Sequence, residues 1–300
     1  MGRRRKGRDI AGWLAVDKPR GPTSADVVNT VRRAFDARKA GHAGTLDPMA
    51  TGLLAIAFGE ATKTIPHVTD AQKAYRFTVR FGVATDTDDA DGRVVGESPR
   101  RPGDAALVAA LTRFTGKIVQ TPPRFSAVHI DGERAHVRAR AGDDVMPAAR
   151  PVTIAALRLI ARPDPDHAEL EMVCGKGAYV RAVARDLGTA LGGCAHVTAL
   201  RRIWSGPFEA EDAIPLARIT AQAGDAALDD LLLPLETGLV GLPELRCAPE
   251  AAARLRHGNP APVLTAANYG DVAWASAAGR AVAIGVYRAG ALHPTRVFAG

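Results

Sequence analysis

A single carboxylate stands in a stretch of unusual composition. Residues 41–54 contain three glycines and one proline, and Asp47 is the only acidic residue between Asp36 and Glu60. Because Pro48 follows Asp47 directly, the backbone of Asp47 is pushed out of the helical region and the loop holds its side chain. A carboxylate fixed in this way can serve as a nucleophile in covalent catalysis. The alternative on composition alone is an exposed turn in which Asp47 bonds to nearby backbone.

The complete motif favours the catalytic interpretation. Residues 41–54 read Gly-His-x-Gly-Thr-Leu-Asp-Pro-x-Ala-Thr-Gly-x-Leu. This string resembles the catalytic motif of the bacterial TruB family of tRNA pseudouridine synthases, which isomerise uridine 55 in the T loop of tRNA. The resemblance covers roughly residues 10–203 and implies that Asp47 is the nucleophile. It also implies an α+β pseudouridine synthase fold, with a mixed, mainly antiparallel sheet flanked by helices and a small C-terminal β-rich domain of the PUA-like type.

Further blocks extend the resemblance to other site residues. In the family, a tyrosine at the position of Tyr75 stacks on the target uracil, an arginine at the position of Arg181 pairs with the catalytic carboxylate, and a leucine at the position of Leu200 packs against the base. On sequence alone Tyr75 is equally a core residue, because it shares a strand face with Phe77. Arg181 is equally a surface residue, because it lies one position off Val180, which belongs to the buried face of its helix.

Two more side chains could contact RNA. Tyr179, like Tyr75, could stack on a flipped base, which is worth about 1–3 kcal/mol per base. His42 could wedge into the RNA or contact a phosphate, or it could stabilise its own loop. We therefore predict a catalytic set of Asp47, Tyr75 and Arg181, and a substrate-binding set of His42, Tyr179 and Leu200.

The chemistry of such a set needs no cofactor. Pseudouridine forms when the N1–C1′ bond of uridine breaks, the uracil turns, and C5 joins C1′. Nothing is oxidised and no group leaves, so neither a redox cofactor nor a metal ion is required. The reaction needs a nucleophile, a guanidinium that keeps it ionised and oriented, exclusion of water, and an acceptor for the C5 proton, for which Tyr75 is the candidate. The base must also be flipped out of folded RNA, at a cost of a few kcal/mol.

The composition is that of an ordinary globular protein. The length of 300 residues predicts two domains with sizeable cores, and the hydrophobic fraction of 47% and charged fraction of 24% are ordinary for a globular protein. No apolar run reaches membrane-spanning length, and Asp17 interrupts the apolar segment that a signal peptide would need after the basic start. The three cysteines are widely spaced, which argues against a disulfide framework and a zinc site. These features predict a cytoplasmic protein with no membrane partner.

The net charge of +7 comes mostly from the N-terminus. Five of the 39 Lys and Arg residues lie between Arg3 and Arg8, and the rest of the chain carries 34 basic against 32 acidic residues. Net charge is therefore weak evidence for a nucleic-acid partner. The basic tail is either a disordered, solubilising extension or an arm that touches phosphates.

We expect the loop that contains Asp47 to lead into a buried strand of a β-sheet. The apolar run Leu53–Phe58 predicts a buried strand directly after the loop, and the alternation over residues 73–81 predicts a half-buried strand. Thr23 and Asp26 predict a capping box at the start of a helix. The other expected elements are a strand at Gly12–Val16, a helix near Asp104–Phe114, strands at Lys117–Gln120, Val152–Ile160 and Ala168–Val173, and a helix that opens near Val180.

The pattern changes at about residue 240. The segment before it is rich in Ala, Asp and Pro and predicts helices and connections, whereas a helix near Pro249–His257 and strands at Val272–Ala275 and Val282–Tyr287 predict a β-rich module after it. We expect a basic disordered tail at 1–8, a catalytic domain at 9–240 and a PUA-like RNA-binding domain at 241–300. The resemblance implies that the partner is the T arm of tRNA, bound by a monomer without a guide RNA.

Three rival functions fit the residues less well. An RNA-binding protein or tRNA-folding chaperone with an idle pocket would not need Asp47, Tyr75 and Arg181 together. A dyskerin-type synthase, which works on guide RNAs, is disfavoured by the bacterial-style residues 50–54 and by the acidic loop at 86–92. A metal-dependent hydrolase would need ligand spacing that the sequence lacks.

Two local features limit what can be carried over. The acidic loop resembles a calcium loop, but its register places Ser98 where a bidentate Glu is required. Phe125, His129 and His136 stand where the family usually has a tyrosine, a lysine and an aromatic residue. Substrate contacts of those three side chains are therefore not inferred from the resemblance.

Overall fold

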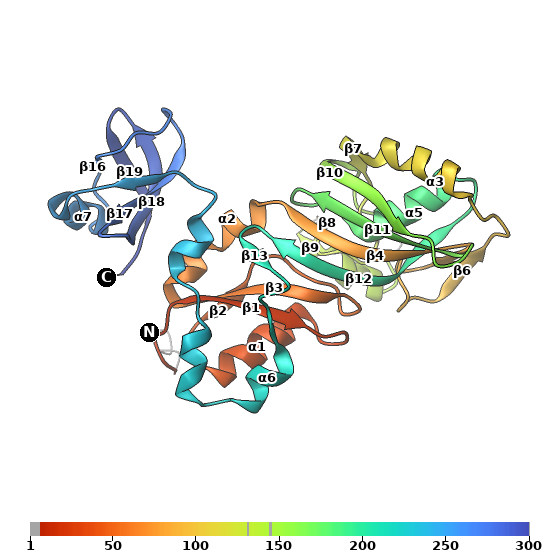
Figure 1. The fold of residues 1–300 in the computed structure, drawn as a ribbon, viewed down its shortest axis with the longest axis horizontal. Coiled ribbons are helices and arrows are strands. Elements are labelled where there is room, and N and C mark those ends of the chain that lie inside the picture. Colours follow the sequence, from red (N-terminus) through yellow and green to blue (C-terminus); the bar gives the residue numbers. More distant parts are fainter. Residues whose placement is uncertain (1–6, 131, 144–145, 300) are drawn as a thin grey trace.

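A ten-stranded mixed sheet forms the centre of the molecule (Figure 1). The structure is a computed structural model that describes residues 7–130, 132–143 and 146–299. The strands are β1 (Gly12–Lys18), β2 (Ala40–His42), β3 (Thr51–Phe58), β4 (Lys73–Phe81), β7 (Gly116–Gln120), β10 (Arg150–Ala161), β11 (His167–Cys174), β12 (Ala195–Ser205), β13 (Phe208–Glu209) and β14 (Ile214–Pro215). Their main order is β14-β1-β3-β12-β4-β11-β10-β7, with β2 beside β3 and β13 beside β12. Only the β1–β14 and β3–β12 pairs are parallel, so the predicted mixed, mainly antiparallel sheet is confirmed.

Four helices pack on one face of this sheet. α1 (Ser24–Ala34), α3 (Asp104–Leu111), α5 (Val180–Ala190) and α6 (Leu216–Ala221) share one hydrophobic core with the strands. α1 begins at the predicted capping box, in which the Thr23 side chain bonds to the backbone N–H of Asp26 and the Asp26 side chain bonds back. Within the described residues, no helix is both long and apolar enough to span a membrane.

The opposite face is covered over β1 and β3. Trp13 and Ala15 point away from the main core because side chains alternate along a strand. They pack under the 3-10 turn Gly59–Thr64, α2 (Ile65–Asp70) and the 3-10 turn Leu235–Leu239. β3 is therefore buried on both faces, which is why its sequence is a continuous apolar run.

The sheet is joined by only a short pairing where β3 meets β12. These two strands pair only through Thr51 with Arg201 and Gly52 with Arg202, whereas β12 pairs with β4 along its length. Gly52 has a φ of +94°, and a Cβ there would lie 2.4 Å from the Arg202 carbonyl oxygen. A glycine is thus required for the close approach. The segment between β2 and β3, residues 43–50, is held at this point and is called the Asp47 loop below.

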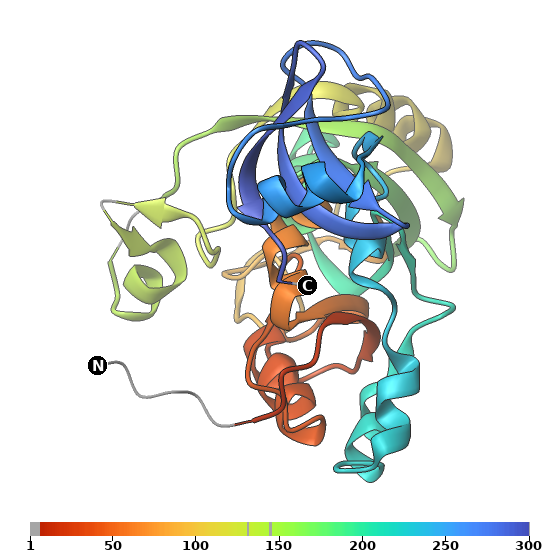
Figure 2. The ribbon, with the colours of Figure 1, turned by 90° about the vertical axis from the view of Figure 1, so that its left-hand side faces the viewer.

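A second, smaller sheet follows at the C-terminus (Figures 1 and 2). Its order is β15 (Glu244–Arg246), β17 (Val272–Ala277), β18 (Arg280–Arg288), β19 (Ala291–Val297) and β16 (Ala261–Pro262), with α7 (Pro249–Arg256) packed on its own core. The Lys63 ammonium donates to the Val297 carbonyl at 2.8 Å, and the Glu60 carboxylate accepts from the Ala299 N–H at 2.8 Å. These bonds dock the small sheet on the turn that follows β3.

A long insertion between β7 and β10 projects from the body (Figure 2). It contains β8 (His129–Ile130), β9 (Glu133–Arg134) and α4 (Ala135–Arg140). A separate hairpin, β5 (Val83–Thr85) with β6 (Val94–Glu97), carries the acidic loop. Both lie next to the start of α5 through bonds described below.

The structure differs from the sequence expectations at several elements, and the short elements β2, β5, β6, β8, β9, β13, β14, α2 and α4 were not expected. β12 was not predicted, because bulges near Val197 and Arg202 break the alternation that would mark it. β15, β16 and β19 were also missed, since they are short or interrupted by Pro294. Arg8, expected in a disordered tail, pairs its backbone with Asp36 and its side chain with Asp229. Residues 1–6 of that tail and the His136 side chain lie outside the described part of the chain.

Candidate active site

Three buried side chains, Lys18, Ser24 and Arg202, hold the backbone of the Asp47 loop through hydrogen bonds. The Lys18 ammonium donates to the carbonyls of Pro48 at 3.1 Å and Ala50 at 2.7 Å, on either side of Met49. Ser24 both donates to and accepts from the backbone of Leu46. Burial lowers the pKa of Lys18 to about 8, and the nearby carboxylate of Asp47 opposes that shift.

Arg202 holds the same loop from β12. Its Nε donates to the Leu53 carbonyl at 2.7 Å and its Nη2 to the Gly44 carbonyl at 3.1 Å. The side chain is fully buried. Arg202 therefore joins the start of the loop at Gly44 to β3 at Leu53, and Lys18 bonds to Pro48 and Ala50 near the end of the loop. Together these bonds fix the backbone that carries Asp47.

Asp47 forms a two-pronged ion pair with Arg181. Arg181 Nε lies 2.8 Å from Asp47 Oδ2, and Nη2 lies 3.1 Å from Oδ1. The arginine side chain is 3% exposed, whereas the carboxylate side chain is 32% exposed. A fork of this geometry orients both carboxylate oxygens. The arrangement leaves the carboxylate accessible while its partner is buried.

Arg181 is itself held by backbone from two other segments. Its Nη1 donates to the Thr87 carbonyl at 2.8 Å and its Nη2 to the Phe125 carbonyl at 2.9 Å. Asp89 stands 3.6 Å from its Nε. Burial raises the pKa of Asp89, while the Thr87 hydroxyl and Arg181 work against that rise. The sequence placed Arg181 off the face of α5 that packs on the sheet, and from that position alone it would be a surface residue. The side chain is nevertheless buried, because the loops that contain Thr87 and Phe125 cover it.

Tyr179 stands directly before α5, two residues before Arg181, and its neighbours hold it in place. Tyr179 exchanges two hydrogen bonds with the Gln120 amide, from its N–H at 2.8 Å and to its carbonyl at 3.2 Å. The Arg150 guanidinium lies over the Tyr179 ring, 5.5 Å from its centroid. The ring is half-buried, so it is oriented yet reachable.

Tyr75 lies on β4 directly opposite Arg202 of β12 and Met172 of β11. It is partly buried against the main core. Burial raises the pKa of Tyr75, the positive charge of Arg202 lowers it, and the charge of Asp47 raises it further. The hydroxyl is thus within the electrostatic reach of the Asp47 carboxylate.

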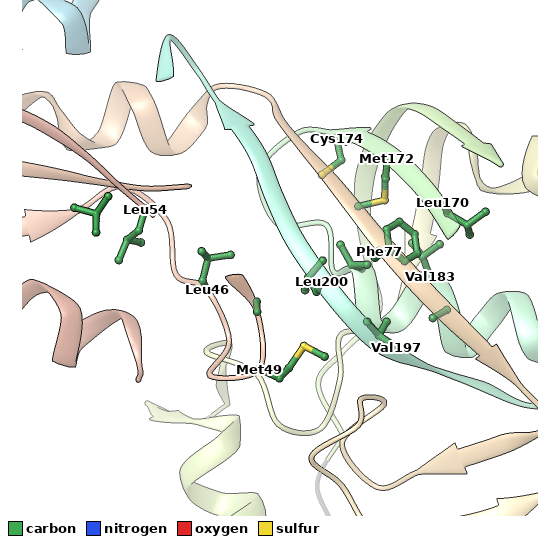
Figure 3. Close-up of a cluster of buried hydrophobic side chains, with 14 of the residues drawn as sticks. Leu46, Met49, Leu54, Phe77, Leu170, Met172, Cys174, Val183, Val197 and Leu200 are labelled. Carbon is green, nitrogen blue, oxygen red and sulfur yellow. The ribbon is translucent and has the colours of Figure 1, made fainter. Parts of the chain in front are cut away.

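Leu200 and His42 complete the surroundings. Leu200 is 7% exposed and shares the main core with Leu46 and Met49 of the Asp47 loop (Figure 3). His42 is half-buried, and its Nδ1 has no hydrogen-bond partner among the described residues. Burial and the positive charge of Arg202 lower the pKa of His42, which favours the neutral imidazole at neutral pH.

A hollow of about 610 Å³ lies apart from these groups. It is lined by residues such as Arg76, Arg201 and Trp204 on the opposite face of β4 and β12, although Met49 and Leu200 border it. Asp47, Tyr75 and Arg181 are not among its lining residues. In the described part of the chain, no cluster of three or more His, Cys, Asp or Glu side chains is placed to bind a metal ion.

Comparison with known proteins places the chain in a family. Residues 32–180 match the model for the N-terminal domain of the TruB family pseudouridylate synthases, and residues 181–240 match that of the tRNA pseudouridylate synthase B C-terminal domain. The chain is 64% identical to tRNA pseudouridine synthase B of Dinoroseobacter shibae over 99% of this chain and 98% of the relative. It is 63% identical to tRNA pseudouridine synthase B of Ruegeria pomeroyi over 100% of this chain and 99% of the relative. The chain belongs to the TruB family of pseudouridylate synthases.

Solved structures support the fold of this TruB-family protein. A chain of an H/ACA RNP bound to a substrate RNA containing 2′-deoxyuridine has a TM-score of 0.75 at 21% identity, over 96% of this chain and 85% of that chain. A chain of a Cbf5-Nop10-Gar1 complex has a TM-score of 0.75 at 24% identity, with the same coverage. The predicted pseudouridine synthase fold with a PUA-like C-terminal domain is confirmed. The border between the two family models falls just inside α5, so it is not a border between structural units.

The TruB-family structure brings together most of the predicted site. Asp47 and Arg181 are bonded, the charge of Asp47 acts on the Tyr75 hydroxyl, and Tyr179 lies two residues before Arg181 in the chain. Sequence reasoning missed the supports Lys18, Asp89 and Arg202. Asp89 belongs to the acidic loop at 86–92, but nothing in the spacing of Asp89 or Lys18 predicted a contact with the site. Arg202 lies on a strand that was not predicted, so no sequence signal marked it as buried.

Proposed function

We propose that this protein isomerises uridine 55 in the T loop of tRNA to pseudouridine, with Asp47 as the nucleophile. The single observation that carries the proposal is the accessible Asp47 carboxylate clamped by a buried Arg181. The relatives named tRNA pseudouridine synthase B, which align over the whole chain, support tRNA as the substrate.

In this mechanism Asp47 attacks a flipped uridine while Arg181 keeps the carboxylate ionised and aimed. Four of the five N–H donors of the arginine are used, two on Asp47 and one on each of two backbone carbonyls. A guanidinium in this role stays charged and does not compete as a proton donor. The bonded loop and its apolar floor keep water away from the intermediate.

The remaining predicted residues would hold the RNA. Tyr75 would stack on the uracil and receive the C5 proton, and Leu200 would pack against the other side of the base. His42, which burial keeps neutral, suits a wedge between bases better than a charged phosphate contact. Tyr179 would support the base or its neighbour from the start of α5.

The C-terminal module would add affinity for the T arm and its surroundings. We propose a catalytic domain at 9–240 and an RNA-binding domain at 241–300. The module exposes six arginines with no ion-pair partner among the described residues, which suits contacts to phosphates: Arg246, Arg254, Arg256, Arg280, Arg288 and Arg296. We further propose that the protein acts in the cytoplasm as a monomer, without a guide RNA.

Mass-spectrometric mapping of modified nucleosides tests the proposal. Unmodified tRNA is incubated with the purified protein and digested, and each uridine position is examined for pseudouridine. The proposal expects conversion at position 55 alone, with none in a tRNA that carries cytidine at that position. Pseudouridine elsewhere in the first tRNA, or none at all, would contradict it.

A further inference from the structure

Arg202 is a buried cation without a buried counter-charge. It is 0% exposed and is one of the largest fully buried side chains. Two of its nitrogens bond to backbone carbonyls, but Nη1 is buried with no hydrogen-bond partner in the described residues. No carboxylate of the described chain lies within ion-pair distance of it. Burying such a charge is costly, so a group that becomes negative beside it would be stabilised.

The group beside Arg202 is Tyr75. The two residues are directly opposite in the antiparallel β12–β4 pair, which places both side chains on the same face of the sheet. The positive charge of Arg202 acts directly on the Tyr75 hydroxyl. The other charged or titratable groups near that hydroxyl are Cys174 on β11 and Asp47 on its loop, and neither carries a positive charge.

Lys73 is the second buried cation of this region. It lies next to Arg202, and the carbons of its side chain and Arg202 Nη1 both approach Gly44. Its ammonium is used, because it donates to the carbonyls of Thr69 at 2.7 Å and Ala71 at 2.8 Å. Arg202 is the cation that stands directly opposite Tyr75 in the strand pair and has a buried nitrogen without a hydrogen-bond partner among the described residues.

We propose that Arg202 is a positioning residue of the isomerisation, which joins the start of the Asp47 loop to β3 and stabilises the Tyr75 phenolate that takes the C5 proton. The inference rests on the proposed function, since it concerns a step of that reaction. Arg202 itself touches neither the substrate nor the reacting atoms in this account.

The step balances without any further reagent. Once C5 has joined C1′, C5 still carries its hydrogen. The Tyr75 hydroxyl first gives its proton to solvent, which the positive charge of Arg202 makes easier. The phenolate oxygen then takes the C5 proton, and the C–H electron pair returns to the ring as the C5–C6 double bond. N1, freed from the sugar, gains one proton from solvent, so the base keeps its composition and Tyr75 ends the turnover as the neutral phenol.

A double-mutant cycle tests this role. Single-turnover rates are measured for the wild type, Arg202→Gln, Tyr75→Phe and the double variant, with Arg201→Gln as the matched control. Arg201 pairs with Asp17 on the other face of the sheet. We expect Arg202→Gln to slow the wild type by about 10²-fold or more, as for the loss of a proton-transfer partner. In the Tyr75→Phe background the same change should cost at least about tenfold less than in the wild type, because only the support of the Asp47 loop is then left to lose.

Equal losses in the two backgrounds would overturn the proposal, since they would mean that Arg202 only holds the loop. Wild-type rates for Arg202→Gln would overturn it as well. If Arg202→Gln does not fold, the cycle is run with Arg202→Lys. That variant keeps the charge but loses the fork, so it should give a smaller loss that again depends on Tyr75.

A titration of the phenol separates this inference from the proposed function. The ultraviolet ionisation of Tyr75 is taken as the difference between the wild type and Tyr75→Phe, and then between Arg202→Gln and the double variant. The pKa of Tyr75 should rise when Arg202 is removed, whether or not the protein modifies tRNA. An unchanged Tyr75 pKa would refute the inference alone, whereas failure to make pseudouridine would refute the proposed function.

Discussion

Replacing Arg181 by lysine should slow the chemical step far more than it weakens tRNA binding. The guanidinium makes two bonds to Asp47 and one each to the carbonyls of Thr87 and Phe125. Lysine is a point charge that can keep one bond to the carboxylate. The lost charge-assisted bond is worth about 1.5–3 kcal/mol, which corresponds to about 10- to 150-fold in kcat. The two carbonyls also lose their donor, at about 1–3 kcal/mol of folding free energy each.

The assay is release of tritium from tRNA labelled at C5 of uridine, measured under single-turnover conditions below the thermal transition of the variant. KM should change little, because the lost interaction acts on the nucleophile rather than on phosphates. Arg185→Lys is the matched control, since Arg185 lies one turn later on α5 and bonds to Asp88, Asp186 and the Thr121 carbonyl. Turnover of Arg181→Lys within twofold of the wild type, or an equal loss in the control, would refute the reasoning.

Three further predictions follow from the same structure. Tyr75→Phe should slow the chemical step while Tyr75→Leu also weakens binding of the base; equal, wild-type rates in both would show that Tyr75 is only a core residue. Burial lowers the pKa of Lys18 from 10.5 to about 8, so between these pH values the unfolded chain binds more protons than the folded protein. The wild type should therefore gain stability relative to Lys18→Met as pH rises from 8 to 10.5, measured by urea unfolding. A constant difference in stability over this pH range would show that Lys18 does not titrate there. Truncation near residue 241 should weaken binding of whole tRNA and reduce its salt slope by about 0.7–0.9 per lost phosphate contact, with kcat retained and a minimal T-arm hairpin much less affected. Because the cut uncovers Leu239, which packs on the C-terminal module, circular dichroism must first show that the fragment is folded; unchanged affinity and salt slope would then exclude an RNA-binding role for the module.

Local patterns predicted the parts of the fold that local interactions determine. The apolar run of β3, the alternation of β4 and the capping box at Thr23 each depend on neighbours within a few residues. β12 depends on pairing with strands more than a hundred residues earlier, and its bulges remove the period of two. The position of β12 between β3 and β4 could therefore not be predicted from the sequence of β12 alone.

The candidate site shows the same division. Asp47 could be found from sequence because its motif is long and contiguous. The burial of Arg181 could not, because the backbone that covers it comes from the segments around Thr87 and Phe125. Arg202 required both the strand and its register opposite Tyr75. Residues that hold the site through contacts between distant segments show no characteristic spacing in the sequence.

Asp47→Asn provides the most direct test of the central claim. The change keeps the shape of the side chain and removes the charge that the nucleophile needs, and it leaves the phosphate contacts untouched. Mass spectrometry of tRNA after prolonged incubation with saturating variant should find no pseudouridine at position 55, while filter binding shows an affinity close to that of the wild type. Substantial conversion at position 55 by the folded Asp47→Asn protein would contradict the account.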